Sequence, residues 1–168
     1  DWGQHGLQRK SVAVAKKLLA EAGYPDGRDI ETGKPLVLYL DTPGGGPDDA
    51  ARLSWLRKQF NKLNIQLQIR DTDYNRFQDK MLKGTAQMFS WGWNADYPDP
   101  ENFLFLLYGP NFRHGHGVEN VTGYASEEFD TLFRRMETMD NTAERLEIIS
   151  RIQAVLQHDA PLHFGYFP

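Results

Sequence analysis

The stretch that decides the fold is Leu36-Val37-Leu38-Tyr39-Leu40, a continuous apolar run of strand length. Such a run is expected where both faces of a sheet are covered, so it predicts a central strand. Downstream, Ile65 to Ile69 alternates apolar and polar residues, which predicts a strand nearer an edge. A third strand is predicted over Ala86 to Trp91.

Helical patterns separate these predicted strands. A glycine-rich link, Thr42 to Pro47, leads into a helix that Asp48 is expected to cap, and Asp71-Thr72-Asp73 is expected to cap a second helix that Gly84 ends. Strands that alternate with helices of this length predict right-handed crossovers. The fold class is therefore α/β, a mostly parallel sheet with helices on both faces. The glycine run matches neither common phosphate-binding motif, and its neighbouring aspartates would repel an anion.

Further helices flank this unit. Residues 1–10 show no clear period and are expected to be a connection, followed by an amphipathic helix from Val12 that Gly23 stops. Near the other end, Ser126 is expected to cap one helix, and Asn141-Thr142-Ala143-Glu144 resembles a capping box for a second. These two helices are expected to form a hairpin on the sheet, before a short strand at 162–167.

Composition excludes several classes of protein. The chain has 168 residues, of which 40% are hydrophobic and 12% aromatic, enough for the core of one globular domain. Its net charge of −4 argues against a general nucleic-acid binder, so no nucleic acid is expected among its partners. There is no cysteine for a disulfide or a thiolate nucleophile, and no apolar run near the ~20 residues that span a bilayer.

The candidate site is the segment from Ser90 to Leu104. It contains two tryptophans, a tyrosine, two asparagines and three carboxylates, while Gly92, Pro98 and Pro100 exclude a regular helix or central strand. It follows the third predicted strand, where open α/β sheets usually present ligands. Aromatic rings beside an aspartate suit an amphipathic ligand with a positive charge. The alternative is a surface loop whose aromatics close over a core edge.

The histidines do not predict a metal site. His114 and His116 lie in a polar loop expected over Gly109 to Thr122, and they have no third partner at a plausible spacing. His5, His158 and His163 are isolated, and we expect them to be structural. No metal ligand, cofactor or catalytic residue is therefore predicted.

Several stretches, taken together, resemble one known family. They occur in the order Ala15 to Gly27 (AKKLLAEAGYPDG), Trp91 to Pro100 (WGWNADYPDP), Gly123-Tyr124 with Glu128-Phe129-Asp130, and Asp159-Ala160-Pro161. From Ser11 to Pro168 the chain resembles the C-terminal lobe of the extracellular solute-binding proteins of the peptide-transport family, bacterial family 5. The resemblance implies a periplasmic-binding-protein type II-like lobe. Residues 1–168 would then be a single α/β lobe, a fragment of a longer two-lobed receptor.

The resemblance also implies a function without catalysis. Family members bind a solute between two lobes and feed an inner-membrane ABC permease, so the expected partners are a peptide or other small solute, the permease and the missing N-terminal lobe. The expected location is periplasmic or extracellular, with or without a lipid anchor. In oligopeptide receptors of this family, the aspartate at the position of Asp96 receives the peptide's α-ammonium group, and the tryptophan at Trp93 lines the same cavity. Asn94 and Tyr97 complete the predicted substrate-binding set.

Two alternatives stay open. The same receptor fold could serve another solute, such as an oligosaccharide, a nickel complex, haem or an opine, because fold does not fix the ligand. A carbohydrate-active enzyme would instead use Asp96, Asp99 or Glu101 as acid and base, with the tryptophans stacking on sugars. The prolines at 98 and 100 argue against two of these carboxylates pointing into one cleft.

Overall fold

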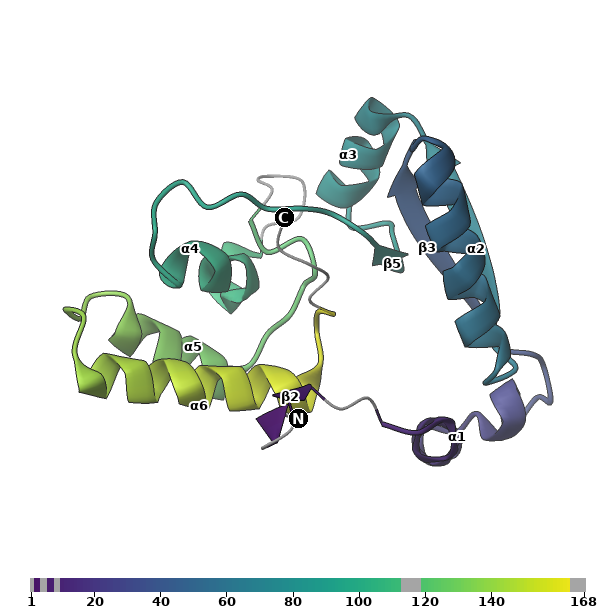
Figure 1. The fold of residues 1–168 in the computed structure, drawn as a ribbon, viewed down its shortest axis with the longest axis horizontal. Helices are drawn as coiled ribbons and strands as arrows, with labels where there is room; N and C mark the ends of the chain where they lie inside the picture. Colours follow the sequence, from purple (N-terminus) through teal and green to yellow (C-terminus); the bar gives the residue numbers. More distant parts are fainter. Residues whose placement is uncertain (1, 4–5, 8–9, 113–118, 164–168) are drawn as a thin grey trace. The chain divides into compact units, whose positions relative to one another are not determined.

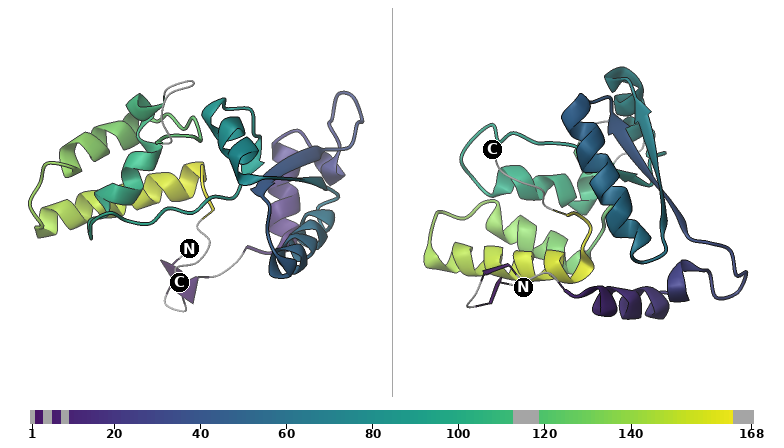
Figure 2. Two further views of the ribbon diagram at one scale, coloured as in Figure 1. Left: turned by 90° about the horizontal axis from the view of Figure 1, so that it is seen from above. Right: turned by 45° about the vertical axis from the view of Figure 1, so that its right-hand side comes forward.

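The computed structural model describes residues 2–3, 6–7, 10–112 and 119–163. They fall into two compact units (Figures 1 and 2). The first unit comprises residues up to Phe77 together with Ala86–Trp91, and the second comprises Gln78–Thr85 together with the residues from Gly92 onward.

A three-stranded parallel sheet organises the first unit. The central strand β3 (Val37–Pro43) pairs with β4 (Gln66–Thr72) on one side and with β5 (Met88–Phe89) on the other. The connections from β3 to β4 and from β4 to β5 cross the sheet in opposite directions, so right-handed crossovers place their helices on opposite faces. Accordingly α2 (Pro47–Asn61) and the first turn of α3 (Tyr74–Leu82) lie on opposite sides of the sheet (Figure 2). The predicted central strand and parallel sheet are confirmed.

The third strand is shorter than predicted, because its flanking residues make other contacts. Met88 and Phe89 pair with β3, but the Gln87 side chain, through Oε1, accepts the Tyr39 backbone N–H at 2.8 Å. At the other end, Trp91 turns its ring edge-on to the buried Phe77, with ring centroids 5.6 Å apart. Side-chain contacts thus replace the backbone pairing that was expected at the two ends of the predicted strand.

The cap of α2 differs from expectation, whereas the cap of α3 lies within the predicted range Asp71–Asp73. Helix α2 begins at Pro47, so Gly46 and not Asp48 is its N-cap residue, without a side-chain hydrogen bond. Proline favours this first helical position because its fixed φ suits the helix and its missing N–H needs no partner there. Strand β4 continues through Thr72, which leaves Asp73 as the cap of α3. Its Oδ1 accepts the Arg76 backbone N–H at 3.0 Å.

The segment before the sheet contains one helix and one turn. Helix α1 (Val12–Glu21) is capped by the Ser11 hydroxyl and followed by Gly23 at φ +90°, the stop that the sequence predicted. None of its residues is buried. The 3-10 turn η1 (Pro25–Gly27) follows. Residues 1–10 were expected to be a connection without a clear period, and within them β1 (Trp2–Gly3) and β2 (Gly6–Leu7) form a short antiparallel pair.

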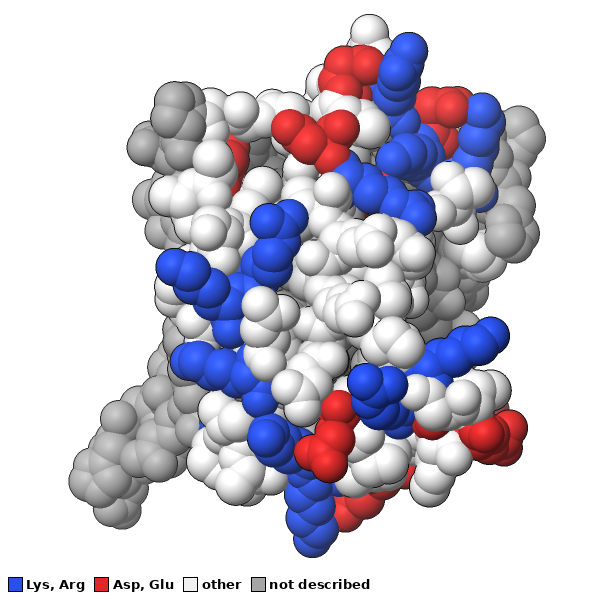
Figure 3. Space-filling model, turned by 90° about the vertical axis from the view of Figure 1, so that its right-hand side faces the viewer, with Lys and Arg blue, Asp and Glu red and all other residues white. Residues whose placement is uncertain are grey.

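The surface carries a mixture of charges. Figure 3 shows Lys and Arg side chains on one face of the molecule with Asp and Glu side chains among them. In the first unit such pairs form within helices, as between Arg52 and Asp49 at 3.3 Å. Within the described part of the chain, no helix is both long enough and apolar enough to cross a membrane.

The second unit contains the predicted helical hairpin, formed by α5 (Glu127–Met136) and α6 (Ala143–Asp159). Ser126 caps α5 and Thr142 caps α6, each through its side-chain oxygen. The hairpin was expected to lie on the sheet. Within the second unit, its apolar face packs on α4 (Glu101–Leu104) and on the 3-10 turn η2 (Phe105–Leu107), which supply matching apolar surface. The buried cluster is Leu104, Leu107, Phe129, Leu132, Phe133, Met136, Ile148, Ile152 and Leu156.

Helix α6 ends at Asp159. Ala160 adopts a left-handed conformation (φ 48°, ψ 47°) and its N–H bonds to the Leu156 carbonyl, which ends the helix before Pro161. Residues 161–163 have no regular structure, and the rest of the strand expected at 162–167 lies outside the described residues. The polar loop expected at 109–122 begins with a 3-10 turn, η3 (Gly109–Asn111). His5, His114 and His116 also lie outside the described residues.

Candidate ligand-binding site

The candidate segment is an irregular loop, as its glycine and prolines predicted. Between β5 and α4 the chain has neither helix nor strand. From Gly92 onward this loop belongs to the second unit, together with α4 and the α5–α6 hairpin. The position of its side chains therefore depends on contacts to those helices.

Trp93 and Asp96 are brought together by Asn102, a residue of α4. The Trp93 indole Nε1 donates a hydrogen bond to Asn102 Oδ1 at 3.0 Å, and the Asp96 backbone N–H donates to the same oxygen at 3.0 Å. Asn102 is 3% exposed. Trp93 also meets Phe105 edge-to-face, with ring centroids 5.4 Å apart. The indole is thus fixed along one edge and stays half-buried.

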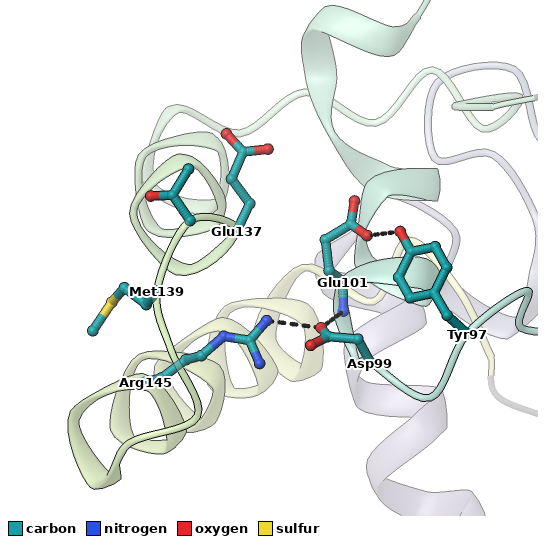
Figure 4. Close-up of a pocket in the computed structure, with 7 residues that line it drawn as sticks. Tyr97, Asp99, Glu101, Glu137, Met139 and Arg145 are labelled. Carbon is teal, nitrogen blue, oxygen red and sulfur yellow. Dashed lines mark hydrogen bonds and ion pairs between the residues drawn. The ribbon is translucent and has the colours of Figure 1, made fainter.

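The other predicted site residues are exposed. The Asp96 carboxylate and the Asn94 amide have no hydrogen-bond or ion-pair partner within the part of the chain that the structure describes. Tyr97 is also exposed, and its hydroxyl donates to Glu101 Oε2 (Figure 4). The Glu101 carboxylate raises the pKa of Tyr97 above 10.0, while a hydrogen bond from the Asn102 side chain acts in the opposite sense.

Asp99 has a structural environment that the sequence did not predict. Its Oδ1 accepts the Glu101 backbone N–H at 2.8 Å and the Arg145 Nη2 at 2.7 Å. The hydrogen bond from Arg145 holds the pKa of Asp99 below its usual 3.8. Since Asp99 is committed to Arg145 and Glu101 to Tyr97, neither is positioned as a free catalytic acid or base.

A depression of about 420 Å³ opens beside this ion pair (Figure 4). Asp99 and Arg145 meet at its floor, the Tyr97–Glu101 pair lies on one side, and Glu137 and Met139 lie across from it. Trp93, Asn94 and Asp96 are not among its lining residues. The depression is therefore distinct from the predicted set, although Tyr97 belongs to both. No group of three or more potential metal ligands occurs among the described residues.

The remaining motifs of the family resemblance are structural in this fold. The Tyr124 hydroxyl donates to Asp159 Oδ2 at 2.5 Å, which joins the third motif to the fourth. Asp130 Oδ1 accepts the Gly109 backbone N–H at 2.9 Å. In the first motif, Gly27 lies so close to the backbone carbonyl of Asn64 that a Cβ would approach its oxygen to 2.6 Å.

Comparison with known proteins identifies the family. The model of "bacterial extracellular solute-binding proteins, family 5 Middle" matches residues 2–114. Heme-binding protein A of Haemophilus influenzae is 27% identical over 147 residues, and the periplasmic oligopeptide-binding protein OppA of Escherichia coli is 28% identical over 162. These alignments cover 88% and 95% of this chain, but the chain spans only 26% and 27% of the two relatives.

A solved structure shows the same fold. The oligopeptide-binding protein AppA of Bacillus subtilis, in complex with a nonapeptide, superposes with a TM-score of 0.79 at 20% identity, over 100% of this chain and 33% of that one. Together with the family match, this confirms the predicted α/β architecture. The chain belongs to family 5 of the bacterial extracellular solute-binding proteins, which are receptors and not enzymes.

Proposed function

We propose that this chain is the ligand-binding lobe of a longer family 5 receptor that delivers peptides to an ABC importer. The observation that carries the proposal is the exposed Asp96 carboxylate, which has no partner among the described residues. It lies on a loop in which Asn102 accepts hydrogen bonds from both the Trp93 indole and the Asp96 backbone. The longer receptor would supply a second, N-terminal lobe, and it would work in the periplasm or outside the cell beside an inner-membrane permease.

The chemistry of a peptide terminus fits this pair. A free α-amino group titrates near ~8 and is mostly cationic at neutral pH, so a carboxylate is its natural partner. The Trp93 ring adds stiff apolar area close by, and Asn94 and Tyr97 are polar groups on the same loop. Recognition of the terminus leaves side chains free, so we expect specificity for the peptide form and not for one sequence.

A second candidate ligand is haem, because one relative is named a heme-binding protein. The two candidates differ in charge. A peptide offers an ammonium group to Asp96, whereas the propionates of haem are anionic and would be repelled by it. Binding that depends on a ligand's positive charge therefore separates peptide from haem and from neutral sugars.

The test is calorimetric titration of the full-length receptor with a tripeptide and with its N-acetylated form. Removing one partner of a buried charge pair costs ~2–5 kcal/mol, or roughly 30- to several-thousand-fold in affinity. We expect Asp96→Asn to weaken binding of the free tripeptide by that factor and acetylation to do the same to the wild type. Asp140→Asn is the matched control, since Asp140 is exposed and unpaired among the described residues.

Two results would contradict the proposal. If Asp96→Asn binds the tripeptide as tightly as the wild type does, the chain is a peptide receptor but Asp96 is not part of its binding site. Absence of tripeptide binding, with a Soret shift on addition of haem, would replace the peptide by haem on the same fold.

A further inference from the structure

We infer that Asn102 is the positioning residue of this site and that it holds the Asp96 backbone, from which the carboxylate extends, at a fixed place relative to the Trp93 indole. The inference rests on the proposed function, because it concerns how that same site recognises a cationic terminus. Asn102 is not one of the predicted ligand-binding residues, and its hydrogen bonds can be tested in the receptor without any ligand.

One oxygen performs this role. Asn102 Oδ1 accepts from Trp93 Nε1, nine residues earlier, and from the Asp96 backbone N–H, six residues earlier, both at 3.0 Å. The loop contains no helix or strand that could relate these two groups otherwise. The shared acceptor therefore fixes the distance between the indole and the Asp96 backbone.

The acceptor is itself held rigidly. Asn102 is buried, and two residues later on the same helix Leu104 packs in the core cluster of the second unit. Between Asp96 and Asn102 the chain is fixed again where Asp99 bonds to Arg145. The core of the second unit thus holds the loop at both residues, and Asp96 keeps mainly the rotation of its own side chain.

This geometry has a consequence for recognition. Because the Asp96 backbone is already in place, only the rotation of its side chain has to be ordered when a cationic group arrives, and preorganisation of this kind raises affinity. If Asn102 loses its acceptor, the indole N–H and the Asp96 N–H lose their shared partner, and the constraint between the indole and the Asp96 backbone is lost with it. Affinity for a peptide with a free, charged N-terminus should therefore fall more than affinity for the same peptide with an acetylated N-terminus.

The first arm of the test is hydrogen exchange of the full-length receptor without ligand. Asn102→Leu keeps the approximate size of the side chain but removes the acceptor, and we expect the Asp96 amide to exchange about tenfold faster. Asn102→Asp retains an oxygen acceptor and should restore slow exchange. Asn120→Leu is the control: Asn120 is 2% exposed and its amide bonds to the Tyr108 and Tyr124 carbonyls, not to the loop. Unchanged exchange in Asn102→Leu would overturn the inference.

The second arm is the ratio of the affinities for a free and an N-acetylated tripeptide. We expect Asn102→Leu to weaken binding of the free tripeptide about 10- to 100-fold and to bring the ratio toward one, whereas Asn120→Leu should leave the ratio unchanged.

Faster exchange with an unchanged ratio would overturn the link between Asn102 and recognition. If Asn120→Leu lowers the ratio equally, the effect is general destabilisation, and the inference fails. Wild-type protein that binds neither peptide would refute the proposed function and this link with it, and the exchange arm would still decide whether Asn102 positions the loop.

Discussion

The guanidinium of Arg145 lies 2.7 Å from Asp99 Oδ1, across 46 residues of sequence. The Arg145 side chain is 4% exposed and that of Asp99 27%. Arg145 also donates from Nε to the Met136 carbonyl at 3.1 Å and from Nη1 to Asn141 Oδ1 at 2.6 Å. One buried cation therefore connects the candidate loop, the end of α5 and the link into α6.

Arg145→Met should destabilise the protein by about 2–4 kcal/mol, because it breaks a buried pair and frees the Met136 carbonyl, while Asp99 keeps some contact with water. Urea denaturation measures the effect as a lower midpoint. The matched control is Arg135→Met, whose pair with Glu144 is more than half exposed and should contribute less than about 1 kcal/mol. Equal midpoints for the two variants would show that burial of the Arg145 pair does not matter.

The stability from this pair should depend on pH. Arg145 lowers the pKa of Asp99 in the folded state below 3.8, so the unfolded state binds the proton more readily. The contribution of the Asp99–Arg145 pair to the free energy of unfolding is then complete above the pKa of Asp99 in the unfolded state. It is lost as pH falls through the lower pKa of Asp99 in the folded state. We expect the stability difference between wild type and Asp99→Asn to be largest above about pH 4 and to shrink below it. A series of urea midpoints at decreasing pH measures this difference, and a constant difference would contradict it.

The sequence predicted those features of the fold that depend on local pattern. The apolar run that contains Leu40 is the central strand, and the caps at Ser126 and Thr142 begin a real hairpin. What it missed depends on distant partners. The third strand is short because Trp91 turns toward Phe77, a contact that no periodicity encodes.

The contacts of the candidate site were harder to predict than its position. The loop lies where its composition indicated, but the fixing residues Asn102 and Arg145 were not singled out. Arg145 did carry a signal, since it falls in register with the buried Ile148 and Ile152 on α6. A lone arginine in an apolar stripe predicts a buried partner. Asn102 had no comparable signal, because its two bonds depend on the path of an irregular loop.

The contact between Tyr124 and Asp159 should stabilise the end of α6. The phenol donates to the carboxylate at 2.5 Å, and burial together with Asp159 raises the pKa of Tyr124 above 10.0. Tyr124→Phe should cost about 1–2 kcal/mol, the low end of the range for a hydrogen bond to a charged group, because this contact is exposed. Tyr74→Phe is the control, because Tyr74 is 51% exposed and its hydroxyl has no partner among the described residues. Spectrophotometric titration should also show one late-titrating tyrosine fewer in Tyr124→Phe, and an unchanged titration would contradict the contact.

Two glycines of the first unit allow steric contact to be separated from backbone strain. Gly27 has φ +70° and Gly33 has φ +66°, so alanine is strained at both positions, by about 1–2 kcal/mol. At Gly27 a Cβ would also lie 2.6 Å from the Asn64 carbonyl oxygen, whereas at Gly33 nothing lies within 4 Å. Gly33→Ala should therefore lower stability only by the strain. Gly27→Ala should lower it by roughly 2–3 kcal/mol more, since η1 must move away from the segment before β4. Thermal melting of both variants tests this difference. Equal losses would mean that η1 and the Asn64 backbone are not in close contact.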